Sequence, residues 1–201
     1  MNKFVTTDSK EYISKLSFLK KYIKYNKGFI AGGAFKNLFL GEKVRDIDIF
    51  FESEEDFLQA EDEYKRSKSF KISYKNDNCI AFYEKSTSIT IELVKSQFHP
   101  VEEMISKFDF TIVKIALYKI ENEDSIDYKL VYHPQFFEHL LGKRLIIDEG
   151  MVDSVATFNR ALKYAGYGYG LCYGSKIKLV EGIINNGNIE SVSSQLYFGF
   201  D

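Results

Sequence analysis

The sequence is short of cysteine and of net charge, and each shortage excludes a class of protein. Cys79 and Cys172 are the only cysteines among 201 residues, too few for a disulfide framework or a four-ligand zinc site. Two reduced cysteines fit the reducing cytoplasm, where we expect the protein. A single disulfide between them is the alternative. The 27 Lys and Arg residues balance 29 Asp and Glu residues to a net charge of −2, so no overall basic field indicates nucleic acid. A site for a polyanion must therefore be a local patch.

Long hydrophobic runs are also absent. No apolar stretch approaches the ~20 residues that span a bilayer, and the N-terminus MNKFVTTDSKEYISK lacks the apolar core of a signal peptide. We therefore expect no membrane segment and no secretion. With 2 prolines, 13 glycines and an apolar share of 45%, the composition is neither collagen-like nor that of a disordered chain. The length indicates one large domain or two small ones.

Hydrophobic periodicity predicts alternating helices and strands as far as about residue 96. A helix over 9–25 carries a lysine-rich face, and Gly41 and Ser53 are residue types that end and begin helices. We predict further helices over 34–40 and 54–66, and strands over 28–31, 46–51, 70–74, 79–83 and 88–94.

After His99-Pro100 the pattern becomes mostly helical. We predict helices over 101–108, 110–117, 134–141, 153–167 and 175–185, the last closed by Asn186-Gly187. The stretch 164–173 contains three glycines but lacks the Lys-Ser/Thr ending of a phosphate-binding P-loop. We expect this stretch to be a flexible aromatic loop.

Two aspartates in the strand over 46–51 point to metal chemistry. Side chains alternate along a strand, so Asp46 and Asp48 lie on one face while Ile47 and Ile49 turn into the core. Two carboxylates held this close repel each other unless cations lie between them. Mg²⁺, with a bound triphosphate, prefers such oxygen ligands, and two ions can stabilise both the attacking and the leaving oxygen of a phosphoryl displacement.

The neighbouring residues supply the other parts of such a site. Gly32 and Gly33 lack Cβ atoms, so phosphate oxygens can approach the backbone N–H groups that begin the next helix. Glu92, in the strand over 88–94, is the candidate third carboxylate, which binds metal and activates a hydroxyl nucleophile. Lys36 and Arg45 flank the site, where they either neutralise the triphosphate or are simply solvated.

Each feature alone has an ordinary interpretation: a plain Gly-Gly turn, a solvated strand edge, a surface acid. Together they resemble a known family. Gly32-Gly33-Ala34-Phe35-Lys36-Asn37 followed by Asp46-Ile47-Asp48 looks like the signature of the DNA polymerase β-type nucleotidyltransferase superfamily. Ile91-Glu92-Leu93-Val94 is similar to the strand that carries that family's third carboxylate.

Further matches resemble class II CCA-adding enzymes and bacterial poly(A) polymerases. The segment 107–111 is similar to their Arg-Arg-Asp-Phe-Thr motif. The segment 136–146 resembles the stretch that follows this motif in those enzymes, and the segment 159–164 resembles their Leu-Arg-Ala-x-Arg-Phe helix. The resemblance covers about residues 28–168. It implies an α+β fold: a nucleotidyltransferase head, residues 1–97, with a mixed, mostly antiparallel sheet and flanking helices, then a mostly helical neck, residues 98–201, that completes the nucleotide site.

Three neck residues are candidate nucleotide contacts on this resemblance. Arg160 and Lys163 share a helix face and would lie over the nucleotide, but a structural ion pair explains them as well. We expect Asp109 to anchor a helix start or a basic residue, with direct nucleotide contact as the alternative. Where the relatives select bases with a Glu-Asp-x-x-Arg element, this chain has Asp153-Ser154-Val155-Ala156-Thr157, with one acid and no arginine.

The sequence therefore predicts a metal-dependent nucleotidyltransferase. It would bind NTP with two Mg²⁺ ions, or Mn²⁺ in their place, through Asp46, Asp48 and Glu92, and transfer NMP to a hydroxyl with release of pyrophosphate. The resemblance favours an RNA 3′ end as acceptor. A protein or small-molecule acceptor, as in a toxin or effector, and a non-catalytic nucleotide- or RNA-binding module are the alternatives. The shortness of the chain leaves room for a protein partner or a second copy.

Overall fold

A computed structural model describes residues 3–8, 12–122 and 125–185. The chain divides into two compact units. The first comprises residues 1–105 and 113–134, and the second comprises residues 106–112 and 135–201. The sequence predicted a single division near residue 97, whereas in the structure residues 113–134 belong to the first unit. The functions assigned to the two parts stay predictions.

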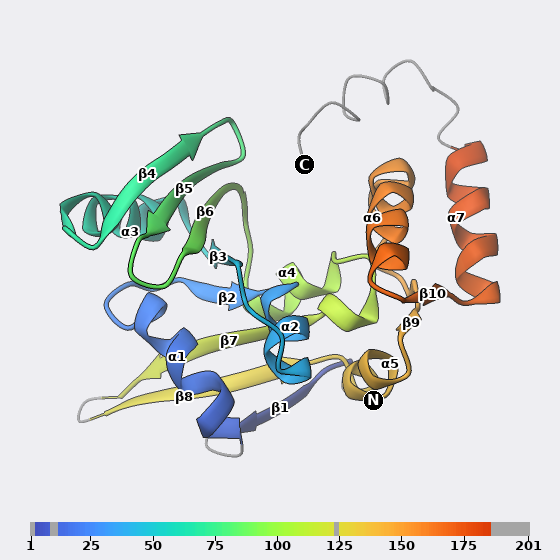
Figure 1. Cartoon of the computed structure of the whole chain (residues 1–201), viewed down its shortest axis with the longest axis horizontal. Coiled ribbons are helices and arrows are strands. Elements are labelled where there is room, and N and C mark those ends of the chain that lie inside the picture. The colour runs from blue at the N-terminus through green and yellow to red at the C-terminus, as the bar shows by residue number, and fades with distance from the viewer. Residues whose placement is uncertain (1–2, 9–11, 123–124, 186–201) are drawn as a thin grey trace. The chain divides into compact units, whose positions relative to one another are not determined.

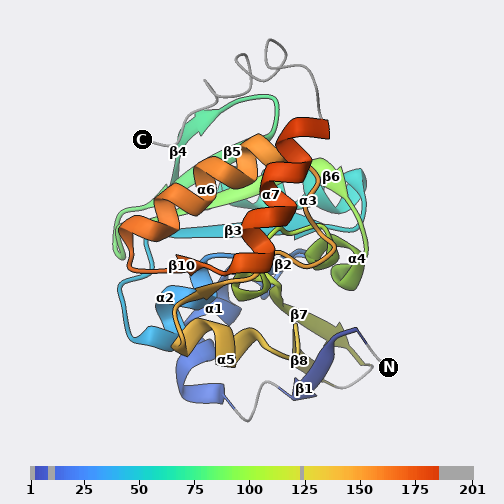
Figure 2. The same cartoon turned by 90° about the vertical axis from the view of Figure 1, so that its right-hand side faces the viewer.

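The first unit is built on an eight-stranded sheet (Figures 1 and 2). The strand order is β1-β8-β7-β2-β3-β6-β5-β4. The pair β3 and β6 is parallel and the other pairs are antiparallel. The strands are β1 (Val5–Asp8), β2 (Phe29–Ala31), β3 (Asp46–Phe51), β4 (Phe70–Lys75), β5 (Cys79–Glu84), β6 (Ile89–Phe98), β7 (Ile115–Glu121) and β8 (Ile126–Tyr132). The predicted α+β fold with a mixed, mostly antiparallel sheet is confirmed.

The helices of this unit begin and end where their local sequence requires. Ser53 caps α3 by accepting a hydrogen bond from the Asp56 N–H, and three acids occupy the first turn. Gly41 ends α2 with φ of 72°, a conformation that glycine adopts without strain. The helices are α1 (Ile13–Ile23), α2 (Ala34–Leu40), α3 (Glu54–Arg66) and α4 (Val101–Ser106).

Helices α1 and α3 pack on the same face of the sheet. The rings of Phe57 and Tyr64 on α3 contact Phe51 of β3 and Phe82 of β5, at centroid distances of 5.6 and 5.2 Å. Along β3, Ile47, Ile49 and Phe51 are buried while the alternate residues are not. The alternation that the sequence predicted for β3 therefore directs its apolar side chains to the helix-covered face.

The helix predicted over 110–117 is wrong. Residues Thr111–Val113 form a short 3₁₀ turn, and the chain then enters β7 and returns along β8. The residues from Ile115 onward form a strand because they pair with β2. This pairing joins distant parts of the chain, so local periodicity does not reveal it.

Among the described residues, the second unit contains three α-helices and a short parallel strand pair. Helices α6 and α7 lie side by side (Figures 1 and 2). The stretch predicted as a flexible aromatic loop is partly regular, because Gly170–Leu171 pairs with Arg144–Leu145 and Tyr169 is buried. Asn186-Gly187 lies outside the described residues. The elements are α5 (Phe136–Leu141), β9 (Arg144–Leu145), α6 (Ser154–Gly166), β10 (Gly170–Leu171) and α7 (Tyr173–Asn185).

Within the described ranges 3–8, 12–122 and 125–185, no helix combines the length and the apolar composition that crossing a bilayer requires.

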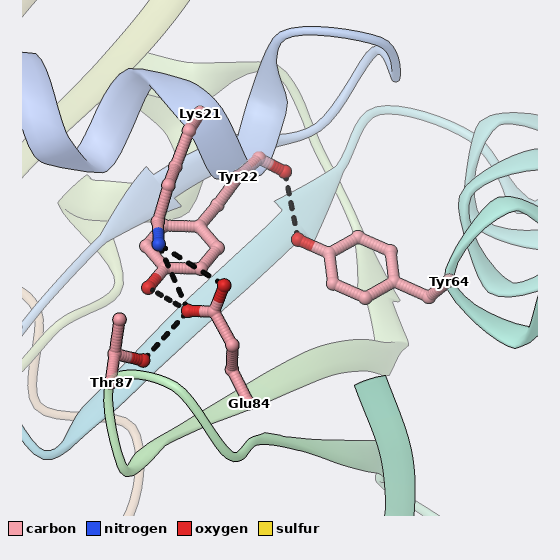
Figure 3. Close-up of polar contacts among 5 residues, drawn as sticks. All are labelled: Lys21, Tyr22, Tyr64, Glu84 and Thr87. Atoms are coloured by element: carbon pink, nitrogen blue, oxygen red, sulfur yellow. Dashed lines mark hydrogen bonds and ion pairs between the residues drawn. The ribbon is translucent and has the colours of Figure 1, made fainter. Parts of the chain in front are cut away.

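A buried carboxylate ties α1 to the sheet (Figure 3). Glu84, at the end of β5, accepts hydrogen bonds from Tyr22 Oη and Thr87 Oγ1, each at 2.7 Å. The ammonium of Lys21 lies 2.9 Å from the same carboxylate. Tyr64 of α3 donates to the Tyr22 carbonyl oxygen at 2.8 Å, so the cluster joins two helices to the sheet. Burial by itself raises the pKa of Glu84, but the hydrogen bonds from Thr87, Lys21 and Tyr22 outweigh it and hold the pKa below its ordinary value.

We predict that Glu84→Gln destabilises the fold by about 1–3 kcal/mol at neutral pH, because hydrogen bonds to a charged acceptor are lost. The folded-state pKa of Glu84 is lowered, so its contribution is fully present above the unfolded-state pKa of about 4.3 and is lost as pH falls through the folded-state value. Urea unfolding across this range should show wild type and variant converging in acid. The exposed Glu52, changed to Gln, is the control. An equal loss in both variants would contradict the role of the cluster.

Candidate active site

Three acids lie at neighbouring positions on the sheet face opposite α1 and α3. Asp46 and Asp48 alternate with the buried Ile47 and Ile49 along β3. The parallel pairing of β3 with β6 places Asp48 directly beside Glu92 and Asp46 beside Thr90. The shared face expected for Asp46 and Asp48 is therefore present, and tertiary structure adds Glu92 to it.

The carboxylates are not gathered into a ready ion site. In the part of the chain that the structure describes, no group of three or more His, Cys, Asp or Glu side chains is arranged to hold a metal ion. Glu92 is engaged by its neighbours instead. The Tyr74 hydroxyl of β4 donates to Glu92 Oε1, and the Cys79 thiol of β5 lies 3.9 Å from Oε2.

These two neighbours stay protonated beside the acids. Burial raises the pKa of the Cys79 thiol to about 11, and the negative charges of Glu92 and Asp48 add to this. Burial, followed by the hydrogen bond to Glu92, also raises the pKa of Tyr74 above its ordinary value. Both groups therefore act as neutral neighbours of Glu92.

A β-bulge directs Tyr74 to this face. On β4, Ile72 pairs with Phe82 and Tyr74 pairs with Ala81, so Ser73 is an extra residue in the ladder. Without the bulge, regular alternation would place Tyr74 on the same face as Ile72. Sequence analysis did not identify Tyr74, because nothing in the pattern of residues 70–75 signals the bulge.

The Gly-Gly turn begins next to the acids. Ala31 at the end of β2 pairs with Asp48, and the chain turns at once through Gly32 into α2. Gly32 has φ of 89°, a conformation in which a side chain is strained, and its N–H donates to the Ile115 carbonyl oxygen at 3.2 Å. Gly33 is the N-cap residue of α2.

The two basic residues near the turn differ in their surroundings. Lys36 is buried, and its ammonium lies 3.0 Å from Glu42 Oε2. Arg45 is exposed just before β3, and its carbonyl oxygen accepts the Thr90 N–H at 2.8 Å. The ion pair of Lys36 supports a structural role, while contact of either residue with a triphosphate stays a prediction.

In the second unit, Asp109 holds Arg160. Asp109 is buried, with Oδ1 accepting the Phe110 N–H at 2.9 Å and Oδ2 lying 2.5 Å from Arg160 Nε. This contact agrees with the expected anchoring of a basic residue. Lys163 is exposed on the same helix, α6. Binding of a nucleotide by Asp109, Arg160 or Lys163 stays a prediction.

The acid at the expected base-reading position caps a helix. Asp153 is the N-cap of α6, and its Oδ1 accepts the N–H groups of Val155 and Ala156 at 2.9 and 3.0 Å. The helix cap therefore occupies Oδ1, and of the two carboxylate oxygens Oδ2 is the one that could accept from a base edge.

The fold places the chain in a class of protein. A CCA-adding enzyme in complex with ATP matches with a TM-score of 0.66 at 16% identity, over 93% of this chain and 48% of that chain. The CCA-adding enzyme of Thermotoga maritima complexed with tRNA matches with a TM-score of 0.61 at 14% identity, over 90% of this chain and 46% of that one. The protein therefore has the nucleotidyltransferase fold of CCA-adding enzymes, and it spans about half of their length.

Sequence comparison identifies the family within this class. The sequence model of the Gabija anti-defense 2 family matches residues 6–143, and the chain belongs to that family. A curated relative from Bacillus phage SPbetaL7, named Gabija anti-defense 2, is 24% identical over 163 residues. The aligned region is 81% of this chain and 38% of that relative.

We predict that Arg160→Met destabilises the protein by about 1–2 kcal/mol, because the buried Asp109 carboxylate loses a charged hydrogen-bond donor. The loss is moderate because about half of the Arg160 side chain, 47%, is exposed and water can replace part of the contact. Lys163→Met removes the same charge from the same helix and should cost less. Chemical denaturation measures both variants, and equal stability of Arg160→Met and wild type would argue against a structural ion pair.

Proposed function

We propose that the protein transfers a nucleoside monophosphate from an NTP to a hydroxyl group and releases pyrophosphate. One observation carries the proposal: in a nucleotidyltransferase fold, Asp46, Asp48 and Glu92 occupy adjacent register positions on one sheet face. Acids so close together repel one another, and the fold gains stability when cations neutralise them.

The donor set fits Mg²⁺ in its chemistry. Carboxylate oxygens are the ligands that Mg²⁺ prefers, and Asp46, Asp48 and Glu92 would hold it, Glu92 through Oε2 while Oε1 keeps the hydrogen bond from Tyr74. When bound, Mg²⁺ stabilises the negative charge that develops on the transferred phosphoryl group. The triphosphate would lie against the turn at Gly33, since the Gly32 N–H is already used within the sheet.

Glu92 is the group that accepts the proton of the attacking hydroxyl. Its carboxylate already accepts a hydroxyl hydrogen bond, from Tyr74, in the structure. A base within hydrogen-bond reach of the nucleophile contributes about 10²–10⁴-fold to such a step. The remaining catalysis comes from positioning the NTP and the acceptor in line.

Two classes of acceptor molecule are consistent with this reaction. The likeness to an enzyme solved with tRNA favours an RNA 3′ end. The family name, Gabija anti-defense 2, favours a second acceptor class: a protein component of the defence to which that name refers. We propose that nucleotidyl transfer is the means by which the protein opposes that defence.

Incubation with each α-labelled NTP, Mg²⁺, and either total cellular RNA or total cellular protein tests the proposal. Label in the RNA fraction supports the RNA acceptor, and label in the protein fraction supports the alternative. Absence of label in both fractions, with no pyrophosphate released, would overturn the proposed function.

We predict that Mg²⁺ with NTP raises the melting temperature of wild type and not of Asp46→Asn/Asp48→Asn. A ligand that binds only the folded state stabilises it by mass action, by about 2.7 kcal/mol at a hundredfold excess over Kd. Without ligand, the variant should be at least as stable as wild type, because one source of repulsion is removed.

The matched control for this experiment is Glu52→Gln/Glu55→Gln, which removes two exposed acids. It should keep the full ligand-induced shift. An equal shift in the Asp46→Asn/Asp48→Asn variant would show that these acids do not bind the ligand.

We also predict weak discrimination among ATP, CTP, GTP and UTP, with rates that differ about tenfold. Selection by ~10⁴-fold requires polar groups that a wrong base leaves unpaired. Asp153, the acid at the corresponding position, is used as a helix cap. Stacking on aromatic rings tolerates every base. Incorporation rates at sub-saturating NTP measure this, and strict preference for one NTP would show that other residues read the base.

A further inference from the structure

Tyr74 already occupies the place that the proposed function gives to an acceptor. Its hydroxyl donates a hydrogen bond to Glu92 Oε1, and Glu92 is the group proposed to take the proton from an attacking hydroxyl. We propose that Tyr74 is itself an acceptor, so that the protein attaches a nucleoside monophosphate to its own Tyr74 Oη. This inference rests on the proposed function.

The local fold brings Tyr74 to the site by a specific device. The bulge at Ser73 moves Tyr74 to the face that carries the acids, opposite Ala81 of β5. Ala81 in turn pairs with Glu92. Ala81 of β5 thus lies between Tyr74 of β4 and Glu92 of β6. Because the Ala81 side chain is small, the Tyr74 side chain extends across it to the carboxylate. Bulges at sheet edges commonly redirect a side chain in this way.

Tyr74 is also accessible. It lies on β4, an edge strand of the sheet, and 42% of the residue is exposed. The exposure leaves room for the larger product of the reaction at this edge. The Cys79 thiol, which lies near the other oxygen of Glu92, is buried, whereas the Tyr74 hydroxyl that contacts Glu92 belongs to an exposed residue.

The step uses only groups that the proposed function supplies. An electron pair on Tyr74 Oη forms a bond to the α-phosphorus of the NTP. The bond from the α-phosphorus to the oxygen that bridges to the β-phosphate breaks, and pyrophosphate leaves with that electron pair. The phenolic proton passes to Glu92. The product is a phosphodiester between tyrosine and the nucleoside, and nothing is oxidised or reduced.

A role in positioning makes a different prediction. If Tyr74 only holds Glu92 in place, Tyr74→Phe lowers transfer to every acceptor, and no nucleotide is found on residue 74 of wild type. If Tyr74 is an acceptor, wild type carries the nucleotide there. The site of the covalent label therefore separates the two roles.

The experiment uses the full chain with Mg²⁺ and each α-labelled NTP in turn, without added acceptor. We expect labelled protein, a mass increase of one NMP on the intact chain, and modification at Tyr74 in peptide mass spectrometry. Tyr74→Phe should lose this label, and Glu92→Gln should lose it together with transfer to added RNA or protein. Tyr83→Phe is the matched control, because Tyr83 is a 38% exposed tyrosine on the same sheet face, two residues from Ala81 along β5. This variant should keep the label.

Other outcomes overturn the inference in distinguishable ways. Label on added RNA or protein with none on the chain rejects self-modification and leaves the proposed function in place. Label on Tyr83 or another residue, unchanged in Tyr74→Phe, also rejects Tyr74 as the acceptor. Absence of label on the chain and on every added acceptor rejects both proposals together.

Discussion

The parallel pairing of β3 with β6 is the constraint on which the candidate site depends. Within the eight-stranded sheet this pair is parallel and its neighbours are antiparallel, so residues from distant parts of the chain meet in register at Asp48 and Glu92. Adjacent strands lie about 4.8 Å apart, a spacing at which two carboxylates on one face repel each other. The repulsion makes this face favourable for cations. It also explains why hydrogen-bond donors such as Tyr74 are stable next to Glu92.

Carboxylates on the two faces of the sheet have different neighbours. Glu84 faces α1, where Lys21, Tyr22 and Thr87 satisfy it, so its charge is balanced within the fold. Glu92 faces the opposite side and contacts the neutral hydroxyl of Tyr74 and thiol of Cys79. Glu84 therefore contributes to the stability of the fold, and Glu92 is the acid to which the proposed function gives a catalytic role.

In the second unit, acids in segments that resemble nucleotide-binding motifs have structural contacts. Asp109 holds Arg160, and Asp153 caps α6. These contacts order the helix itself. Both contacts are structural: one joins Asp109 to α6 and the other begins that helix.

The sequence by itself determined several helix ends and the shared face of the two candidate aspartates. The alternation at the start of the strand over 46–51 predicted the shared face of Asp46 and Asp48, and Gly41 and Ser53 predicted the end of α2 and the beginning of α3. Only the tertiary structure decided that residues 115–132 form two strands, that Glu92 lies beside Asp48, and that Tyr74 reaches Glu92. The physical reason is that periodicity and capping act within a few residues. Strand pairing and a bulge depend on partner strands far along the chain, and the sequence pattern of one segment does not reveal those partners.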